Sequence, residues 1–349
     1  MPIDHAPRGV HLVGSVPLAN AEEVFRTTSE VLGARLRRIP DGETGQRATW
    51  IGWHQQVFAS HPAFEPDPTD SDLFGRQHYR LRSGVDAREI GFGPLGYADA
   101  ARASYAVFSQ LREQGVIPRR CRFQVSLPTP LAPVNAHVAS RDRSVVEPLY
   151  EARMLDEVAQ MVAAIPPDQL ALQWDVAPEM TIWEGVSRPH FPDVKPGIVA
   201  RLVRLAQSIP DQVELGYHLC YGDRGHRHTV EPTDTASCVA VANGVSAVVR
   251  RPIQWIHLPV PIERDDDAYF APLRELRLHP ETELYLGLVH IRDGVEGSRR
   301  RIAAASRVVR EFGVATECGM GRRPPERGGA PDRLRELLQI HAEVAAPVA

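Results

Sequence analysis

The chain has 349 residues, of which 40 are Lys or Arg and 44 are Asp or Glu, so its formal net charge is −4. This slight acidity argues against nucleic acid as the main partner, because phosphate binding needs a basic surface. The sequence has no apolar run long enough to cross a bilayer, and its N-terminal segment lacks the pattern of a secretory signal. Four cysteines are too few for a disulfide scaffold, which favours a cytoplasmic protein with free or metal-bound thiols.

Short apolar runs alternate with longer amphipathic stretches along the chain. Each run has the length of a strand, and the stretches between them carry apolar residues at the three- and four-residue spacing of helices. This alternation predicts a single α/β domain over residues 1–349, a (β/α)8 TIM barrel. A doubly wound sheet is the alternative, but no G-x-G-x-x-G loop follows the first expected strand. The expected strands are 10–16, 35–42, 121–129, 170–177, 213–220, 253–260, 283–290 and 313–319.

The segment 45–96 interrupts this alternation. It is dense in Pro and Asp around residues 61–72 and shows no clear strand–helix alternation. We expect an insertion after the second strand that forms a lid or a wall over the barrel mouth.

Reactive side chains fall at the ends of several expected strands, where a barrel assembles its active site. His218 and Cys220 are two residues apart in a strand, so their side chains point to the same face. Cys318 ends the last expected strand, and His257 lies in the sixth. Imidazole and thiolate groups are zinc ligands, so we expect Zn2+ bound by His218, Cys220 and Cys318, with His257 or a water completing the tetrahedron.

Each of these features also has a purely structural interpretation. A histidine and a cysteine two residues apart are common in protein cores, and a closed site with four protein ligands is typical of structural zinc. We assign Cys121 and Cys238 to the core. The segment with His226, His228 and Glu231 could form a second metal site, although a solvated loop explains it equally simply.

The two strand ends H-x-C and E-C-G, at 218–220 and 317–319, resemble the catalytic barrel of cobalamin-independent methionine synthase. That barrel belongs to a superfamily shared with uroporphyrinogen decarboxylase. Four further motifs match in the same order. V-G-S-V-P at 13–17 resembles I-G-S-F-P, and D-G-E at 41–43 with Arg47 resembles H-G-E-x-x-R. L-Q-W-D at 172–175 resembles I-Q-I-D, and V-H at 289–290 resembles part of D-I-H-S.

The resemblance implies a role for each matched residue. Ser15 would contact an amino-acid thiol substrate, and Glu43 and Asp175 would hold its ammonium group. His290 would donate a proton to the leaving group. Zn2+ would bind the substrate sulfur as a thiolate, which is the nucleophile.

Two departures from the family pattern narrow the expected function. The family's metal ligands are His, Cys, Glu and Cys, and the Glu falls where this chain has His257. The family's Asp-Glu-Pro is Asp175-Val176-Ala177 here, with Glu179 further on, which points to a donor other than folate. The chain therefore resembles the short, single-barrel members. We expect a zinc-dependent transferase that moves a methyl or alkyl group from a small-molecule donor to a small-molecule thiol.

Three other functions remain open at this point. The same zinc site could add a thiol to an epoxide, as in the related epoxyalkane:coenzyme M transferases, or run a lyase reaction. A metal-free decarboxylase would need an arginine-rich first-strand motif, which this chain lacks. A non-enzymatic structural zinc protein is the third possibility.

Overall fold

Seven parallel strands form the main sheet of this protein, in the order β1-β4-β5-β6-β7-β8-β9. The structure is a computed structural model that describes residues 6–71, 75–86, 89–222, 225, 227–322 and 331–348. The order of the strands follows the chain and lacks the reversal that defines a doubly wound sheet. The strands are β1 (Arg38–Pro40), β4 (Arg122–Pro128), β5 (Leu170–Val176), β6 (Glu214–Leu219), β7 (Trp255–Pro259), β8 (Glu283–Gly287) and β9 (Gly313–Val314).

The first expected strand, 10–16, is extended but joins the sheet only by single bridges. Val10 pairs with Val314 of β9, and Ser15 pairs with Gly42 just beyond β1, so the segment contacts both edges of the sheet. Side chains inside the sheet occupy carbonyls of this segment, since Gln124 Nε2 donates to Leu12 O at 2.9 Å. For that reason the segment forms no regular ladder of backbone hydrogen bonds with either edge strand. The curled sheet as a whole has a TIM-barrel-like arrangement.

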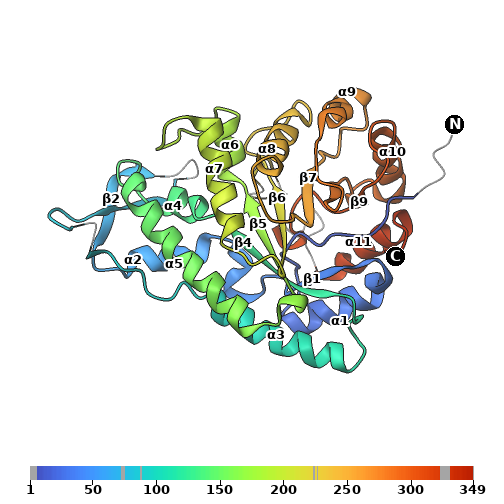
Figure 1. Cartoon of the computed structure of the whole chain (residues 1–349), viewed down its shortest axis with the longest axis horizontal. Helices are drawn as coiled ribbons and strands as arrows, with labels where there is room; N and C mark the ends of the chain where they lie inside the picture. Colours follow the sequence, from blue (N-terminus) through green and yellow to red (C-terminus); the bar gives the residue numbers. More distant parts are fainter. Residues whose placement is uncertain are drawn as a thin grey trace.

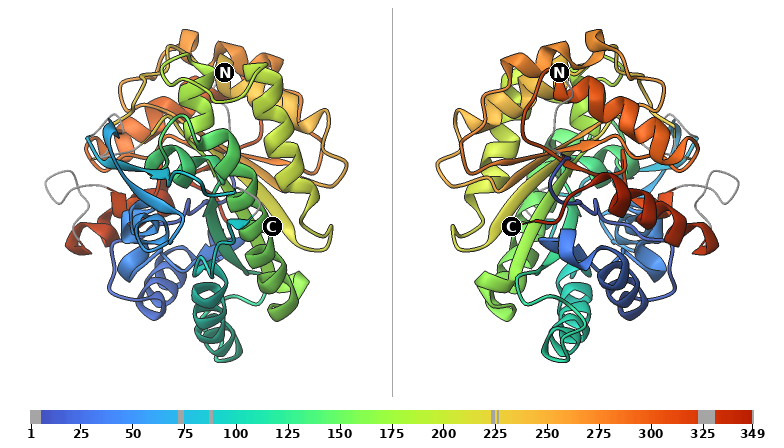
Figure 2. Two further views of the ribbon diagram at one scale, coloured as in Figure 1. Left: turned by 90° about the vertical axis from the view of Figure 1, so that its left-hand side faces the viewer. Right: turned by 90° about the vertical axis from the view of Figure 1, so that its right-hand side faces the viewer.

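Helices cover the outside of the curled sheet, as both views in Figure 2 show. Their apolar faces pack on the strands. In α1, for example, Val24, Phe25 and Leu32 are buried. None of the described helices is long and apolar enough to span a bilayer. The helices outside 45–96 are α1 (Ala21–Leu32), α3 (Tyr97–Glu113), α4 (Leu131–His137), α5 (Arg143–Ala164), α6 (Pro178–Trp183), α7 (Val194–Gln207), α8 (Ala236–Ser246), α9 (Asp267–Phe270), α10 (Gly294–Ser306) and α11 (Pro331–Val344).

The segment 45–96 forms a small structure of its own at one end of the molecule, beside α4 (Figure 1). It contains the helix α2 (Gln55–Ala59) and a hairpin of two antiparallel strands, β2 (Phe64–Ser71) and β3 (Gln77–Leu81). A single bridge between Tyr79 and Val138 ties β3 to the residues that follow α4. Two 3-10 turns, η2 (Gly45–Thr49) and η3 (Gly52–His54), connect β1 to α2.

A buried ion-pair cluster fills the amino end of the sheet. Arg38, at the start of β1, stacks on the Trp255 ring at 4.2 Å from its centroid. Its guanidinium pairs with Glu283 at 2.9 Å and with Glu214. This end is therefore packed with side chains, and the cavity described below lies at the carboxyl ends of the strands.

Candidate metal centre

The register of the sheet places three polar side chains side by side. Asp175 on β5 is opposite His218 on β6, and His218 is opposite His257 on β7. Register partners in neighbouring strands point to the same face, so the three side chains form one row. All three are buried.

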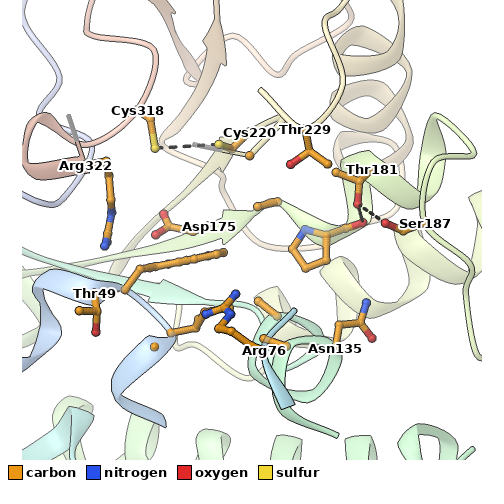
Figure 3. A pocket seen from close by; sticks show the side chains of 18 of the residues that line it. Thr49, Arg76, Asn135, Asp175, Thr181, Ser187, Cys220, Thr229, Cys318 and Arg322 are labelled. Atoms are coloured by element: carbon orange, nitrogen blue, oxygen red, sulfur yellow. Dashed lines mark hydrogen bonds between the residues drawn. The ribbon is translucent and has the colours of Figure 1, made fainter. Parts of the chain in front are cut away.

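Two cysteines from distant parts of the chain meet beside this row. Cys220 follows β6, Cys318 lies beyond β9, and their sulfurs are 3.9 Å apart (Figure 3). One ligand atom each from His218, Cys220 and Cys318 lies within 4.8 Å of the other two. Three of the four expected metal ligands therefore converge, although 98 residues separate the two cysteines (318 − 220).

The geometry of this cluster fits a zinc ion. Two sulfurs bound at about 2.3 Å to one tetrahedral ion lie about 3.8 Å apart, close to the spacing of Cys220 and Cys318. His218 Nε2 is buried and has no hydrogen-bond partner among the described residues. A buried polar nitrogen without a partner is costly, and a metal ion would remove that cost.

His257 lies beside His218 and outside the three-residue ligand cluster. Its Nδ1 is 2.7 Å from His218 Nδ1, and its Nε2 is 3.1 Å from the carbonyl oxygen of Thr316. Burial lowers the pKa of both histidines, so both rings are neutral. Because the Thr316 carbonyl oxygen can only accept, His257 carries its proton on Nε2. His257 Nδ1 therefore accepts a hydrogen bond from the protonated Nδ1 of His218. This tautomer leaves the lone pair of His218 on Nε2, the nitrogen that could bind a metal ion.

Two carboxylates and one arginine lie next to the cysteines. Glu43 pairs with Arg322, and Asp175 accepts a hydrogen bond from Gln173 Nε2 at 2.8 Å. Burial raises the pKa of both acids. Repulsion from Asp41 raises the pKa of Glu43 further, and repulsion from Glu43 does the same for Asp175. Because one arginine balances two carboxylates, this part of the site can accept a further cationic group.

Two glycines allow Ser15 and Glu43 to approach the backbone closely. A Cβ atom at Gly14 would lie 2.4 Å from Glu43 Oε1, and one at Gly319 would lie 2.1 Å from Ser15 Oγ. The Ser15 hydroxyl is buried and has no hydrogen-bond partner in the described structure. Ser15, Glu43, Asp175, His218, Cys220 and Cys318 all line one cavity of about 1140 Å³.

His290 is buried near this cavity but is not among the described residues that line it. Its Nε2 is 2.9 Å from the Val260 carbonyl oxygen, and its Nδ1 is 3.8 Å from Glu317 Oε2. Glu317 also pairs with His228, which contacts Glu231 as well. Although burial opposes it, these contacts raise the pKa of His228 to about 10. Both ring nitrogens of His228 therefore face a carboxylate, and the remaining member of the suggested second site, His226, lies outside the described residues.

Three further residues of the site were not expected from the sequence. Arg322 pairs with Glu43 and donates to the Ala48 carbonyl oxygen at 3.0 Å. Trp50 lines the cavity, opposes the rise in the pKa of Asp175 and has a positive φ of 57°, which is strained for a tryptophan. Gln173 holds Asp175. Two of them had a sequence signal: Gln173 belongs to the L-Q-W-D motif, and Arg322 lies in the loop after the last strand.

Comparison with known proteins supports the fold. No protein-family model matches the chain, and no curated protein matches its sequence. Among solved structures, it resembles a B12-independent methionine synthase from a Shewanella species in complex with selenomethionine. The TM-score is 0.60 and the identity 15%, over 97% of this chain and 98% of the other. It also resembles a methyltransferase from Methanosarcina mazei, with a TM-score of 0.53 and 11% identity, over 98% and 95% of the two chains.

Proposed function

We propose that this protein is a zinc-dependent transferase that moves a methyl or alkyl group to the sulfur of a small thiol. The observation that carries the proposal is the cluster of the His218 ring and the sulfurs of Cys220 and Cys318 in the wall of a large cavity. The names of the two structural neighbours, a methionine synthase and a methyltransferase, are consistent with it.

His218, Cys220 and Cys318 would hold the zinc ion. With three protein ligands, zinc keeps one position for a substrate thiol and lowers its pKa, so that the sulfur is a thiolate near neutral pH. His257 orients His218 through the bond between their Nδ1 atoms. The expectation that His257 is itself a fourth ligand stays a prediction, and it requires the ring to leave Thr316 O or His218.

Glu43 and Asp175 would bind a cationic group of the thiol substrate. A cation next to Asp175 favours its ionised form, which burial otherwise opposes, so binding and ionisation support each other. Ser15 offers a hydroxyl without a partner at the same place. These groups suit an amino thiol as the acceptor, and homocysteine is one example.

His290 as the proton donor to the leaving group stays a prediction. Its Nε2 is bonded to the Val260 carbonyl, so the described geometry leaves Nδ1, which faces Glu317, for proton transfer. An H290A variant with unchanged turnover would remove this role.

We also propose that the segment 45–96 forms one wall of the site. Residues 48–53, with Ser71, Arg76 and His78, line the same cavity as the metal cluster. A variant that shortens the β2–β3 hairpin would therefore change substrate affinity more than zinc content.

Metal analysis of the purified protein tests the proposal most directly. We expect about one zinc per chain, lost in C220S and C318S and retained in C238S, whose sulfur faces Tyr221. Zinc-loaded protein is then incubated with homocysteine and a panel of methyl donors and epoxides, and the product mass separates S-methyl from S-hydroxyalkyl products. Full activity without zinc contradicts the proposal, and S-hydroxyalkyl products favour epoxide opening. X-ray absorption that does not change when a thiol is added favours structural zinc.

A further inference from the structure

Cys220 and Cys318 lie on two loops that no strand pairing joins. Cys220 directly follows β6 and Cys318 lies beyond β9, whereas β7 and β8 lie between these two strands in the sheet. Each loop is anchored to a different neighbour. The Cys220 amide donates to the carbonyl oxygen of Val176 on β5 at 2.9 Å. The other loop packs on the end of β8, where a Cβ atom at Gly287 would lie 2.8 Å from Glu317 Cα. The distance between the two sulfurs therefore depends on contacts between the loops.

The loop after β6 folds back on itself and returns His228 to the end of this strand. The Thr229 amide donates to the Tyr221 carbonyl oxygen at 2.8 Å. Gly222 permits the turn, since it has a positive φ of 89° and a Cβ atom there would lie 2.4 Å from Thr229 Oγ1. Thr229 and Cys220 both line the cavity (Figure 3). The shape of this loop therefore keeps His228 close to the strand end that carries Cys220.

His228 bridges the two loops. Its Nε2 is 3.1 Å from Oε1 of Glu317, the residue before Cys318, and both side chains are only 10% exposed. Its Nδ1 is 2.9 Å from Glu231, which belongs to the same loop as His228 and is 72% exposed. Although burial opposes it, the two carboxylates raise the pKa of His228 to about 10, so the ring is charged at neutral pH. One ion pair thus crosses between the loops, and the other stays within one loop.

The two ion pairs of His228 differ in what their loss would do. Water screens an exposed pair such as the one with Glu231, so that pair constrains the chain little. Removing one partner of the buried pair leaves the other charge without compensation. Glu317 is directly bonded to Cys318, so a shift of its side chain moves a candidate ligand.

We propose that His228 is a positioning residue of the metal centre: its ion pair with Glu317 holds the loops of Cys220 and Cys318 at the spacing that one zinc ion needs. Ligands that are held in place before the ion arrives lose less conformational entropy when it binds, so the ion binds more tightly. The inference rests on the zinc site proposed above. It gives a role to the histidine of the loop after β6 without any contact between that histidine and the metal.

Zinc affinity, measured by competition with a chelator, tests this role. We expect H228A to bind zinc about tenfold or more weakly than the parent protein, the usual effect of losing support behind the ligands. H228R keeps a cation that can reach both carboxylates and should recover most of the loss. In cobalt-loaded protein, thiolate-to-metal charge-transfer absorption at equal metal content should weaken in H228A. Urea denaturation checks that each metal-free variant is folded under the assay conditions.

E231Q is the matched control, because it removes the contact within one loop and keeps the contact between the loops. Its zinc affinity and cobalt spectrum should equal those of the parent protein. E317Q should weaken zinc binding as H228A does. The double variant should bind little more weakly than either single variant, because both substitutions break the same ion pair. This comparison also removes any separate effect of E317Q on His290, which faces the same carboxylate.

Three results would overturn the inference and leave the zinc proposal intact. They are parent-like zinc affinity in folded H228A, fully additive losses in the double variant, and a loss in E231Q as large as that in H228A. A parent protein that binds no zinc would overturn both proposals.

Discussion

His218 and His257 form a hydrogen-bonded pair of imidazoles, with 2.7 Å between their Nδ1 atoms. Because Thr316 O accepts a hydrogen bond from His257 Nε2, His257 Nδ1 has to be the acceptor in the bond between the two rings, and His218 Nδ1 is its donor. Hydrogen bonds to the second nitrogen of a ligating histidine fix its tautomer and orientation. A backbone carbonyl just beyond β9 thus sets the lone pair of the candidate metal ligand His218, which lies three strands away on β6.

Replacing His257 separates this role from direct ligation. We expect H257F to weaken zinc binding about 10- to 100-fold, the usual effect of losing a partner behind a ligand. H257Q should recover much of the loss, because its amide oxygen can accept from His218 Nδ1. Zinc affinity is measured by competition with a chelator, and H218A, which removes a ligand, is the comparison. Equal and complete loss of zinc in H257Q and H218A would instead identify His257 as a ligand.

Gln173 joins four polar groups inside the sheet. Its Nε2 donates to Val13 O at 2.6 Å and to Asp175, and its Oε1 accepts from Trp255 Nε1 at 3.1 Å and faces His11 Nε2. The variant Q173L removes the partner of His11 Nε2 and of Trp255 Nε1 and one donor to Asp175, whereas Val13 O still accepts from Ser126 Oγ at 2.8 Å. We expect the free energy of unfolding to fall by at least about 2 kcal/mol, since two buried groups lose their partner and each costs about 1–3 kcal/mol. Urea denaturation measures it, with the exposed-site variant Q110L as control, and a loss below 1 kcal/mol (roughly the worth of one ordinary hydrogen bond) would contradict the account.

The pH dependence of the free energy of unfolding should reflect the titration of the Glu179 carboxyl group. Burial raises its pKa to about 7, whereas a free glutamic acid titrates near pH 4.3. Between these values the folded chain keeps a proton that the unfolded chain has released, so stability falls as pH rises. The variant E179Q avoids this cost, and we expect it to be about 3 kcal/mol more stable than the parent at pH 8 and nearly equal at pH 4.

Urea denaturation at both pH values tests this expectation for Glu179. E113Q, at an exposed position on α3, is the control and should follow the parent protein at both. A difference between E179Q and the parent that does not change with pH would mean that the Glu179 carboxyl does not titrate in this range.

The sequence predicts the strands well because hydrophobic runs mark buried parallel strands. Seven of the expected runs contain a strand, but 10–16 lacks a ladder because Gln124 and other interior side chains occupy its carbonyls. The proximity of Cys220 and Cys318 could also be predicted, because both follow strands whose carboxyl ends meet at one mouth of the sheet. The pairing of His257 with His218 could not be predicted, since a ring nitrogen serves equally as a ligand or as an acceptor, and side-chain rotation decides between them.

Asp175 should determine which thiols the protein accepts. If it binds an ammonium group, D175N should raise KM for homocysteine about tenfold or more, because a charge-assisted hydrogen bond is lost. The same substitution should change KM little for 4-mercaptobutyrate, which keeps the carboxylate and thiol but lacks the amine. Steady-state kinetics with the two thiols give this comparison within one variant. An unchanged KM for 4-mercaptobutyrate serves as the control for correct folding. An equal rise in KM for both substrates would show that Asp175 shapes the site and does not bind the amine.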